Sequence, residues 1–149
     1  MKKQIISFVV ASYILFVGSA FAGTPNCSNL KGNWVNQLGS TLSIVTIDST
    51  TNAITGTYQS PSGTSGQKFA LSGWINHLKP KPKQDNAQVI SFSVQWGTYG
   101  SITSWTGYCK EQAGKPTIKT LWHLVSSNSQ YTWDHILTNS DIFTPKEDH

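Results

Sequence analysis

The segment AQVISFSVQWGTYGSITSWTGYCKEQAGKPTIKTLWHLV, residues 87–125, decides the fold class. Apolar and polar residues alternate along much of it, which is the two-residue period of a strand with one buried face. In the first run this alternation places four apolar side chains on one face: Ile90, Phe92, Val94 and Trp96. In the last run Ile118, Thr120, Trp122 and Leu124 likewise share one face. Both faces are therefore expected to point into a core.

Similar runs recur along the rest of the chain after residue 22, separated by clusters of Gly, Ser, Thr, Asn and Pro, and none carries a sustained helical period. We expect eight strands, at 32–37, 41–48, 53–60, 67–77, 87–97, 102–111, 116–125 and 131–138. Eight strands suffice to close an antiparallel barrel that either fills itself with side chains or holds one small ligand. The sequence thus predicts an all-β protein with an eight-stranded antiparallel up-and-down β-barrel. A two-sheet sandwich is the alternative.

The first 22 residues are typical of a secretion signal peptide. Lys2 and Lys3 precede an apolar run over 5–17, and small residues surround a cleavage point after Ala22. A membrane anchor is the alternative, but the run is shorter than the roughly 20 residues that cross a bilayer. We expect a secreted or periplasmic protein whose single barrel domain spans 23–149.

Composition and charge argue against nucleic acid binding. The chain has a formal net charge of +4, which falls to +2 without the signal lysines, and it contains no arginine. Because planar recognition of phosphates and base edges relies on guanidinium groups, we expect no nucleic acid partner.

The run KPKPK at 79–83 predicts a stiff solvated loop, and SPSGTSG at 60–66 predicts a flexible one.

Cysteine usage indicates one crosslink. Cys27 and Cys109 are the two cysteines of the chain, and an exported protein passes through an oxidising compartment. We therefore expect a disulfide between them, and no metal site.

The chain has six tryptophans, and several of them sit beside polar residues on faces that should point inward. Ser101, Thr103 and Trp105 alternate on one strand, and Asn36 shares the face of Trp34. Buried hydroxyls and amides without partners cost roughly 1–3 kcal/mol each, so such a group indicates ordered water or a polar ligand. Trp34 and Trp74 are expected to be ordinary core residues.

At this point the chain resembles one family, the biotin-binding avidins and streptavidins, over residues 27–143. The family's local patterns occur in order: GNW (32–34), NQLGS (36–40), GTY (56–58), VQW (94–96), SITSWTG (101–107), KTLWHL (119–124), Trp133 and DIF (141–143). The resemblance implies a binding protein with biotin as its bound ligand and no other cofactor. The cysteine pair also resembles the avidin pair that joins the start of the chain to the sixth strand.

The resemblance also implies how biotin would be held at its polar head. Asn36, Ser40 and Tyr58 would donate hydrogen bonds to the ureido oxygen, as oxyanion donors do. Asp141 and Ser60 would accept from the two ureido N–H groups, and the carboxylate would make the stronger, charge-assisted bond.

For the rest of the ligand the resemblance implies an apolar enclosure and a second polar group. The ring and methylene chain would be enclosed by Leu38, Trp96, Trp105, Trp122 and Leu124. Thr103 would meet the ring sulfur. The ligand carboxylate would be held by Ser62, Gly63, Thr64 and Ser101.

Trp133 matches the family position that reaches into a neighbouring subunit's pocket, which implies a homotetramer. A dimer is the alternative, and the interface positions Leu121, His123 and Thr138 do not distinguish the two.

Three other functions compete with this interpretation. A hydrolase could use His77, His123 or His135, but the chain has no G-x-S-x-G motif and His123 should face away from the pocket, so we expect no catalysis. A lipocalin-like carrier would require an apolar interior in place of Asn36, Ser40, Tyr58 and Asp141. A carbohydrate-binding module would display its aromatic rings on an exposed flat face.

Overall fold

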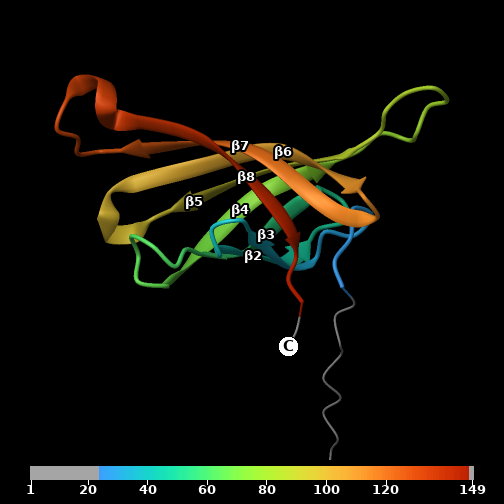
Figure 1. Ribbon diagram of the computed structural model, residues 1–149, viewed down its shortest axis with the longest axis horizontal. Helices are drawn as coiled ribbons and strands as arrows, with labels where there is room; N and C mark the ends of the chain where they lie inside the picture. Colours follow the sequence, from blue (N-terminus) through green and yellow to red (C-terminus); the bar gives the residue numbers. More distant parts are fainter. Residues whose placement is uncertain (1–23, 148–149) are drawn as a thin grey trace, which may run out of the picture.

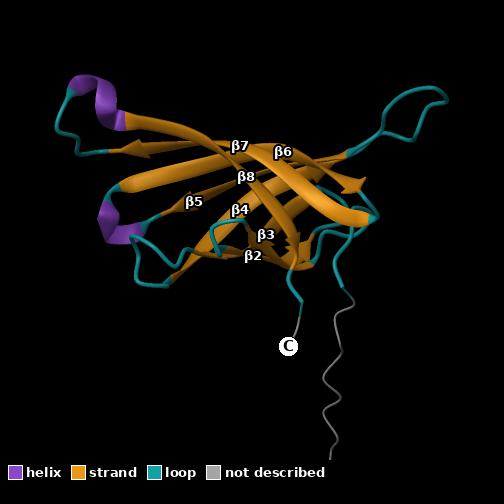
Figure 2. Ribbon diagram, in the orientation of Figure 1, coloured by secondary structure: helices purple, strands orange, loops and turns teal. Residues whose placement is uncertain are grey.

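The computed structural model describes residues 24–147 and shows a closed barrel of eight antiparallel strands (Figures 1 and 2). The strands are β1 (Gly32–Asn36), β2 (Thr41–Ile47), β3 (Ala53–Gln59), β4 (Lys68–Asn76), β5 (Gln88–Gln95), β6 (Ser101–Gln112), β7 (Lys115–Ser126) and β8 (Ile136–Pro145). Two 3-10 turns, η1 (Gly97–Tyr99) and η2 (Thr132–His135), precede β6 and β8. Each strand pairs with the next, and β8 pairs with β1. The predicted barrel is confirmed, and the sandwich is wrong.

The first seven expected strands match β1 to β7 to within two residues at each end. The eighth, expected at 131–138, is wrong, because 132–135 forms η2 and β8 runs to Pro145. Tyr131 and Trp133 have high strand propensity, yet their rings stack in the loop with centroids 4.8 Å apart. β8 continues through its polar middle, TNSD at 138–141, because it pairs along its length with β7, from Val125↔Ile136 to Ile118↔Phe143. Pairing therefore overrode local propensity.

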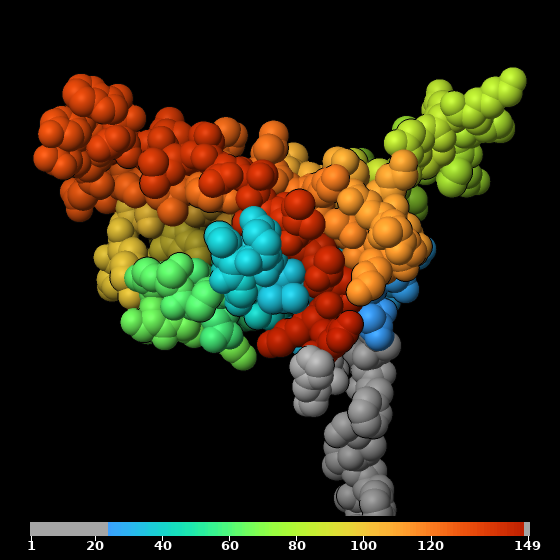
Figure 3. Space-filling view, viewed as in Figure 1, coloured from blue at the N-terminus to red at the C-terminus, as the bar shows by residue number. Residues whose placement is uncertain are grey.

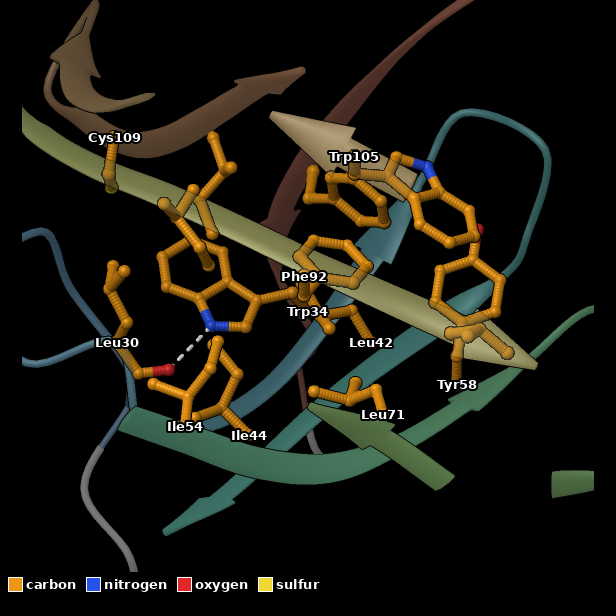
Figure 4. Packing of buried hydrophobic residues seen from close by; sticks show 14 of the residues in the cluster. Leu30, Trp34, Leu42, Ile44, Ile54, Tyr58, Leu71, Phe92, Trp105 and Cys109 are labelled. Carbon is orange, nitrogen blue, oxygen red and sulfur yellow. Dashed lines mark hydrogen bonds between the residues drawn. The ribbon is translucent and has the colours of Figure 1, made fainter. Parts of the chain in front are cut away.

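The buried hydrophobic residues form a packed cluster inside the barrel (Figure 4). The inward faces of β5 and β7 meet there as predicted, with Phe92 and Ile118 fully buried. Trp34 is also fully buried, which confirms it as a core residue, and its indole N–H donates to the Leu30 carbonyl at 2.9 Å. In Figure 4 Leu30 lies at one end of the cluster, whereas the rings of Tyr58 and Trp105 lie at the other, where the packed core ends.

Trp74 is not a core residue: its side chain is 63% exposed. On β4 the strand period turns Leu71 and Gly73 inward, so Trp74 points outward. A Cβ added at Gly73 would lie 2.0 Å from the Ser91 carbonyl oxygen, so glycine lets the two backbones approach closely there. Because Gly73 has no side chain, the pattern of apolar residues did not indicate which face of β4 points inward.

The predicted disulfide between Cys27 and Cys109 is present. It joins the segment before β1 to β6 across 82 residues of sequence. The predicted loop at 79–83 is exposed throughout and belongs to the long β4–β5 connection, which projects from the barrel (yellow-green in Figure 1). The predicted signal peptide lies outside the described residues. Within residues 24–147, no helix has the length and apolar character needed to cross a membrane.

Candidate ligand-binding site

A cavity of about 340 Å³ adjoins the core, and Tyr58, Trp96 and Trp105 belong both to the core cluster and to the cavity lining. Its mouth lies between three connections: the β1–β2 turn at 37–40, the β3–β4 loop at 60–67, and η1. Figure 3 shows the β1–β2 turn (cyan) beside the 60–67 loop (green), with the η1 segment (yellow) nearby. The cavity is lined by Asn36, Leu38, Ser40, Tyr58, Ser60, Ser62, Gly63, Thr64, Trp96, Tyr99, Ser101, Thr103, Trp105, Trp122, Leu124 and Asp141.

This lining includes every residue expected at the site except Trp133. The structure brings these residues together because up-and-down strands place alternate connections at the same end of a barrel. Trp133 lies on η2, 77% exposed and outside the cavity of its own chain. His123 is exposed and faces away from the cavity, as its position between Trp122 and Leu124 predicted.

Asp141 is the buried carboxylate of the polar end, and three N–H donors hold it. Its Oδ1 accepts from Asn36 Nδ2 at 3.1 Å and from Gln37 Nε2 at 3.4 Å. Its Oδ2 accepts from Trp105 Nε1 at 2.8 Å. A carboxylate offers about four lone-pair positions, so Asp141 keeps about one acceptor position for another donor.

Asn36 is oriented by the turn that follows it. Its Oδ1 accepts from the backbone N–H groups of Leu38 at 3.0 Å and Ser40 at 2.8 Å. Because both partners are donors, the amide oxygen must face the turn and the NH₂ group must face Asp141. One proton of that NH₂ goes to Asp141, and the other remains as a donor. A free donor and a free acceptor thus stand side by side at the polar end.

Tyr58 adds a hydroxyl to this group. Burial raises the pKa of the Tyr58 phenol well above its usual value; the neighbouring Ser40 hydroxyl opposes this shift and the Asp141 carboxylate adds to it. Tyr58 therefore stays protonated at physiological pH and can donate a hydrogen bond. Ser60 has the opposite character, because its Oγ donates to the Ser62 carbonyl at 3.0 Å. The same oxygen accepts from the Ser62 backbone N–H at 3.4 Å, which leaves one lone pair to accept from a ligand.

Aromatic rings form the walls. Trp105 stacks on Phe92 with centroids 4.9 Å apart and lies 4.8 Å from the ring of Tyr58. Trp96 meets Trp105 edge to face at 6.4 Å, and its indole N–H donates to Thr103 Oγ1 at 2.7 Å. Because Thr103 accepts this bond, its own hydroxyl proton is left for another acceptor. The walls are therefore held by core packing and by hydrogen bonds at the same time.

The loop at the mouth is partly ordered by its own contacts. Thr64 is buried, and its hydroxyl donates to the Ser60 carbonyl at 3.2 Å. That proton is therefore not free for a ligand while the loop keeps this conformation. Gly63 has a left-handed φ of 75° and exposes its backbone, as a turn at a cavity mouth allows.

Sequence reasoning missed Tyr99, a lining residue on η1 whose ring lies 6.2 Å from that of Phe69. A lone aromatic in the turn between Gly97 and Gly100, next to two predicted strands, is the signal that could have indicated it. It also missed Gln37, which contacts Asp141 from outside the cavity lining.

A closed eight-stranded barrel with hydrogen-bonding groups at the floor of one cavity and aromatic walls above them defines a protein that binds a small ligand. The sequence profile of the Avidin family matches residues 24–146, so the chain belongs to the avidin family, as its resemblance predicted. Proteins of this family are binding proteins.

Individual relatives agree. Avidin from Gallus gallus is 31% identical over 129 residues, which cover 79% of this chain and 78% of avidin. Hoefavidin from Hoeflea phototrophica is 30% identical over 141 residues, covering 83% and 81%. Among solved structures, bradavidin superposes with a TM-score of 0.66 at 31% identity, covering 80% of this chain and 82% of bradavidin. A shwanavidin variant solved as a biotin complex superposes with a TM-score of 0.62 at 32% identity, covering 79% and 98%.

Proposed function

We propose that this chain binds biotin non-covalently in the cavity and performs no catalysis. The observation that carries the proposal is the pairing of Asn36 and Asp141 at the polar end, 3.1 Å apart, with one unused donor and about one unused acceptor between them. A urea group presents the complement of this pattern, because its oxygen accepts while its N–H groups donate. Tyr58 and Ser40 would add donors to the oxygen, and Ser60 would accept from the second N–H.

The walls suit the remainder of biotin. Trp96, Trp105 and Trp122 would enclose the bicyclic ring and methylene chain, with Leu38 and Leu124 at the sides. Each aromatic side chain can bury roughly 150–250 Å², at about 25 cal/mol per Å² of apolar area. The free Thr103 proton would meet the thioether sulfur. Rigid walls also limit the side-chain entropy lost on binding.

The carboxylate tail would extend to the mouth, near Ser101 and the 60–67 loop. Ser62 and the backbone of Gly63 are exposed there and can donate. Thr64 would have to release the Ser60 carbonyl before donating to the ligand.

The relatives support biotin as the ligand, because they include avidin itself and a shwanavidin variant in a biotin complex.

Calorimetric titration with biotin tests the proposal, and intrinsic tryptophan fluorescence should report the same event because the rings line the cavity. Saturable binding of one biotin per chain is the expected result. Asp141→Ala should weaken binding by about ten- to a hundredfold, the cost of a hydrogen bond to a charged group, and leave the fold intact.

Two results would oppose the proposal. Binding of a long-chain fatty acid in place of biotin would indicate a lipocalin-like carrier. Unchanged biotin affinity in Asp141→Ala would mean that the head-group assignment is wrong.

Recovery of chemically unchanged biotin after denaturation is expected of a protein without catalysis.

We also propose that the chain forms a homotetramer in which Trp133 completes a neighbouring subunit's cavity. Its 77% exposure and its position outside the lining of its own chain's cavity support this role. Leu121 and Ile142 are exposed on the adjoining outer faces of β7 and β8, where a subunit could pack. Light scattering should give a mass of four protomers, and a mass of two would overturn the tetramer. Trp133→Ala should weaken biotin binding in the tetramer.

The disulfide between Cys27 and Cys109 supports export to an oxidising compartment. We therefore propose a secreted or periplasmic protein, released by cleavage after Ala22. Mass spectrometry of the protein recovered from the culture medium or periplasm should find Gly23 at its N-terminus.

A further inference from the structure

We propose that Gln37 is a positioning residue for biotin binding: its side-chain amide closes the barrel seam beside Asp141 and aims the carboxylate into the cavity. The inference rests on the proposed function, because it concerns the same site. Gln37 itself does not line the cavity. It would act on the ligand through Asp141.

The seam is the place where β1 ends before β8 does. The β1–β8 ladder has three register pairs, which are Trp34↔Pro145, Val35↔Thr144 and Asn36↔Phe143. Beyond Asn36 the chain turns toward β2, so the residues of β8 before Phe143 have no strand on that side. Asp141 lies in this stretch, two residues past the last pair.

The Gln37 side chain takes the place of the missing strand. Its Oε1 accepts from the Ile142 backbone N–H at 2.9 Å, and its Nε2 donates to the Ser140 carbonyl at 3.2 Å. Ser140 and Ile142 share the backbone orientation of Thr144, which pairs with Val35 of β1. One side-chain amide thus continues the ladder across both neighbours of Asp141.

The same amide also reaches the carboxylate. Its Nε2 lies 3.4 Å from Asp141 Oδ1, the oxygen that accepts from Asn36. The backbone on both sides of Asp141 and one of its carboxylate oxygens therefore contact a single side chain. Gln37 is exposed, so water can replace it at the seam, but water would not fix the direction of the carboxylate.

Two substitutions separate the seam from the carboxylate. Gln37→Met keeps the length of the side chain and removes all three contacts. Gln37→Glu keeps an acceptor for the Ile142 N–H, but it removes the Nε2 donor to Ser140 and Asp141 and places a second negative charge beside the carboxylate. The matched control is Gln95→Met, because Gln95 is exposed on the outer face of β5.

The experiment measures biotin dissociation rates by competition with excess ligand, together with hydrogen exchange of the Ile142 amide. Dissociation should be about tenfold faster in Gln37→Met and at least as fast in Gln37→Glu, as expected for the loss of a bond to a charged group. Exchange at Ile142 should accelerate in Gln37→Met and stay slow in Gln37→Glu. On an Asp141→Ala background, Gln37→Met should change the rate less than twofold. Gln95→Met should change neither quantity.

Each outcome has one meaning. If Gln37→Glu restores the dissociation rate along with Ile142 protection, Gln37 merely closes the barrel and the positioning role is wrong. An undiminished effect of Gln37→Met on the Asp141→Ala background would also overturn it. If the unmodified chain does not bind biotin, the proposed function fails first, and the positioning role fails with it.

Discussion

The indole N–H of Trp105 donates to Oδ2 of Asp141 at 2.8 Å, and both side chains are buried. The two residues come from β6 and β8, which are separated in the barrel by β7. Through this bond the aromatic wall and the polar floor of the cavity form one unit. A wall tryptophan thus also sets the direction of the carboxylate that would meet the ligand.

Trp105→Phe tests this relationship. Phenylalanine keeps most of the ring area against Phe92 but loses the N–H donor. We expect biotin affinity to fall by about ten- to a hundredfold, since hydrogen bonds to charged groups contribute about 1.5–3 kcal/mol. Calorimetry measures the change. Trp74→Phe is the control and should leave the affinity unchanged, because Trp74 lies on the outer surface; equal losses in both variants would contradict the role of the N–H group.

Tyr58 should make the protein sensitive to alkali. Burial raises the pKa of its phenol in the folded state, so the unfolded chain ionises first, near pH 10. The contribution of Tyr58 to stability is therefore complete below that pH and is lost as the pH rises through the folded pKa. Thermal unfolding from pH 8 to 11 should show Tm falling more steeply above pH 10 in the unmodified protein than in Tyr58→Phe. Parallel curves would show that another group controls the alkaline limit.

The disulfide should be a major source of stability. The disulfide between Cys27 and Cys109 closes a loop of 82 residues and so restricts the unfolded chain. In the chain-entropy treatment this raises the free energy of unfolding by about 4–5 kcal/mol. The double variant with serine at both positions should unfold roughly 10–20 °C lower, as measured by calorimetry. Reducing the unmodified protein should reproduce the shift, and reduction should not affect the double variant. A Tm unaffected by either treatment would refute the estimate.

Gly107 should not tolerate a side chain. It lies on the inward face of β6, and a Cβ there would sit 1.9 Å from the Lys119 carbonyl oxygen of β7. Gly107→Ala must push the two strands apart, so we expect a loss of about 1–3 kcal/mol or more in urea unfolding. Ser104→Ala, on the outer face of the same strand, removes one exposed hydrogen bond to Ser93 and should cost less. Equal stability of the two variants would show that the strands adapt.

Some features followed from local sequence because their cause is local. The two-residue alternation over 87–125 predicted the strands and their inward faces, since a strand turns successive side chains to opposite sides. The ordered family patterns predicted which residues line the cavity. The predictions for Trp74 and for the last strand were wrong because both depended on a neighbouring strand. The inward face of β4 follows from the close approach of β5 at Gly73, and β8 exists because it pairs with β7.

By itself, the sequence determined an all-β chain with alternating faces, a pair of cysteines and an unusual set of polar side chains among tryptophans. The tertiary structure decided which of these meet. Asn36 and Asp141, 105 residues apart, share a hydrogen bond because β8 returns to β1. Gln37 became a partner of Asp141 because β1 stops one residue earlier and leaves the seam to its side chain. Closure of a barrel is a property of all eight strands together, so no short stretch of the chain encodes it alone.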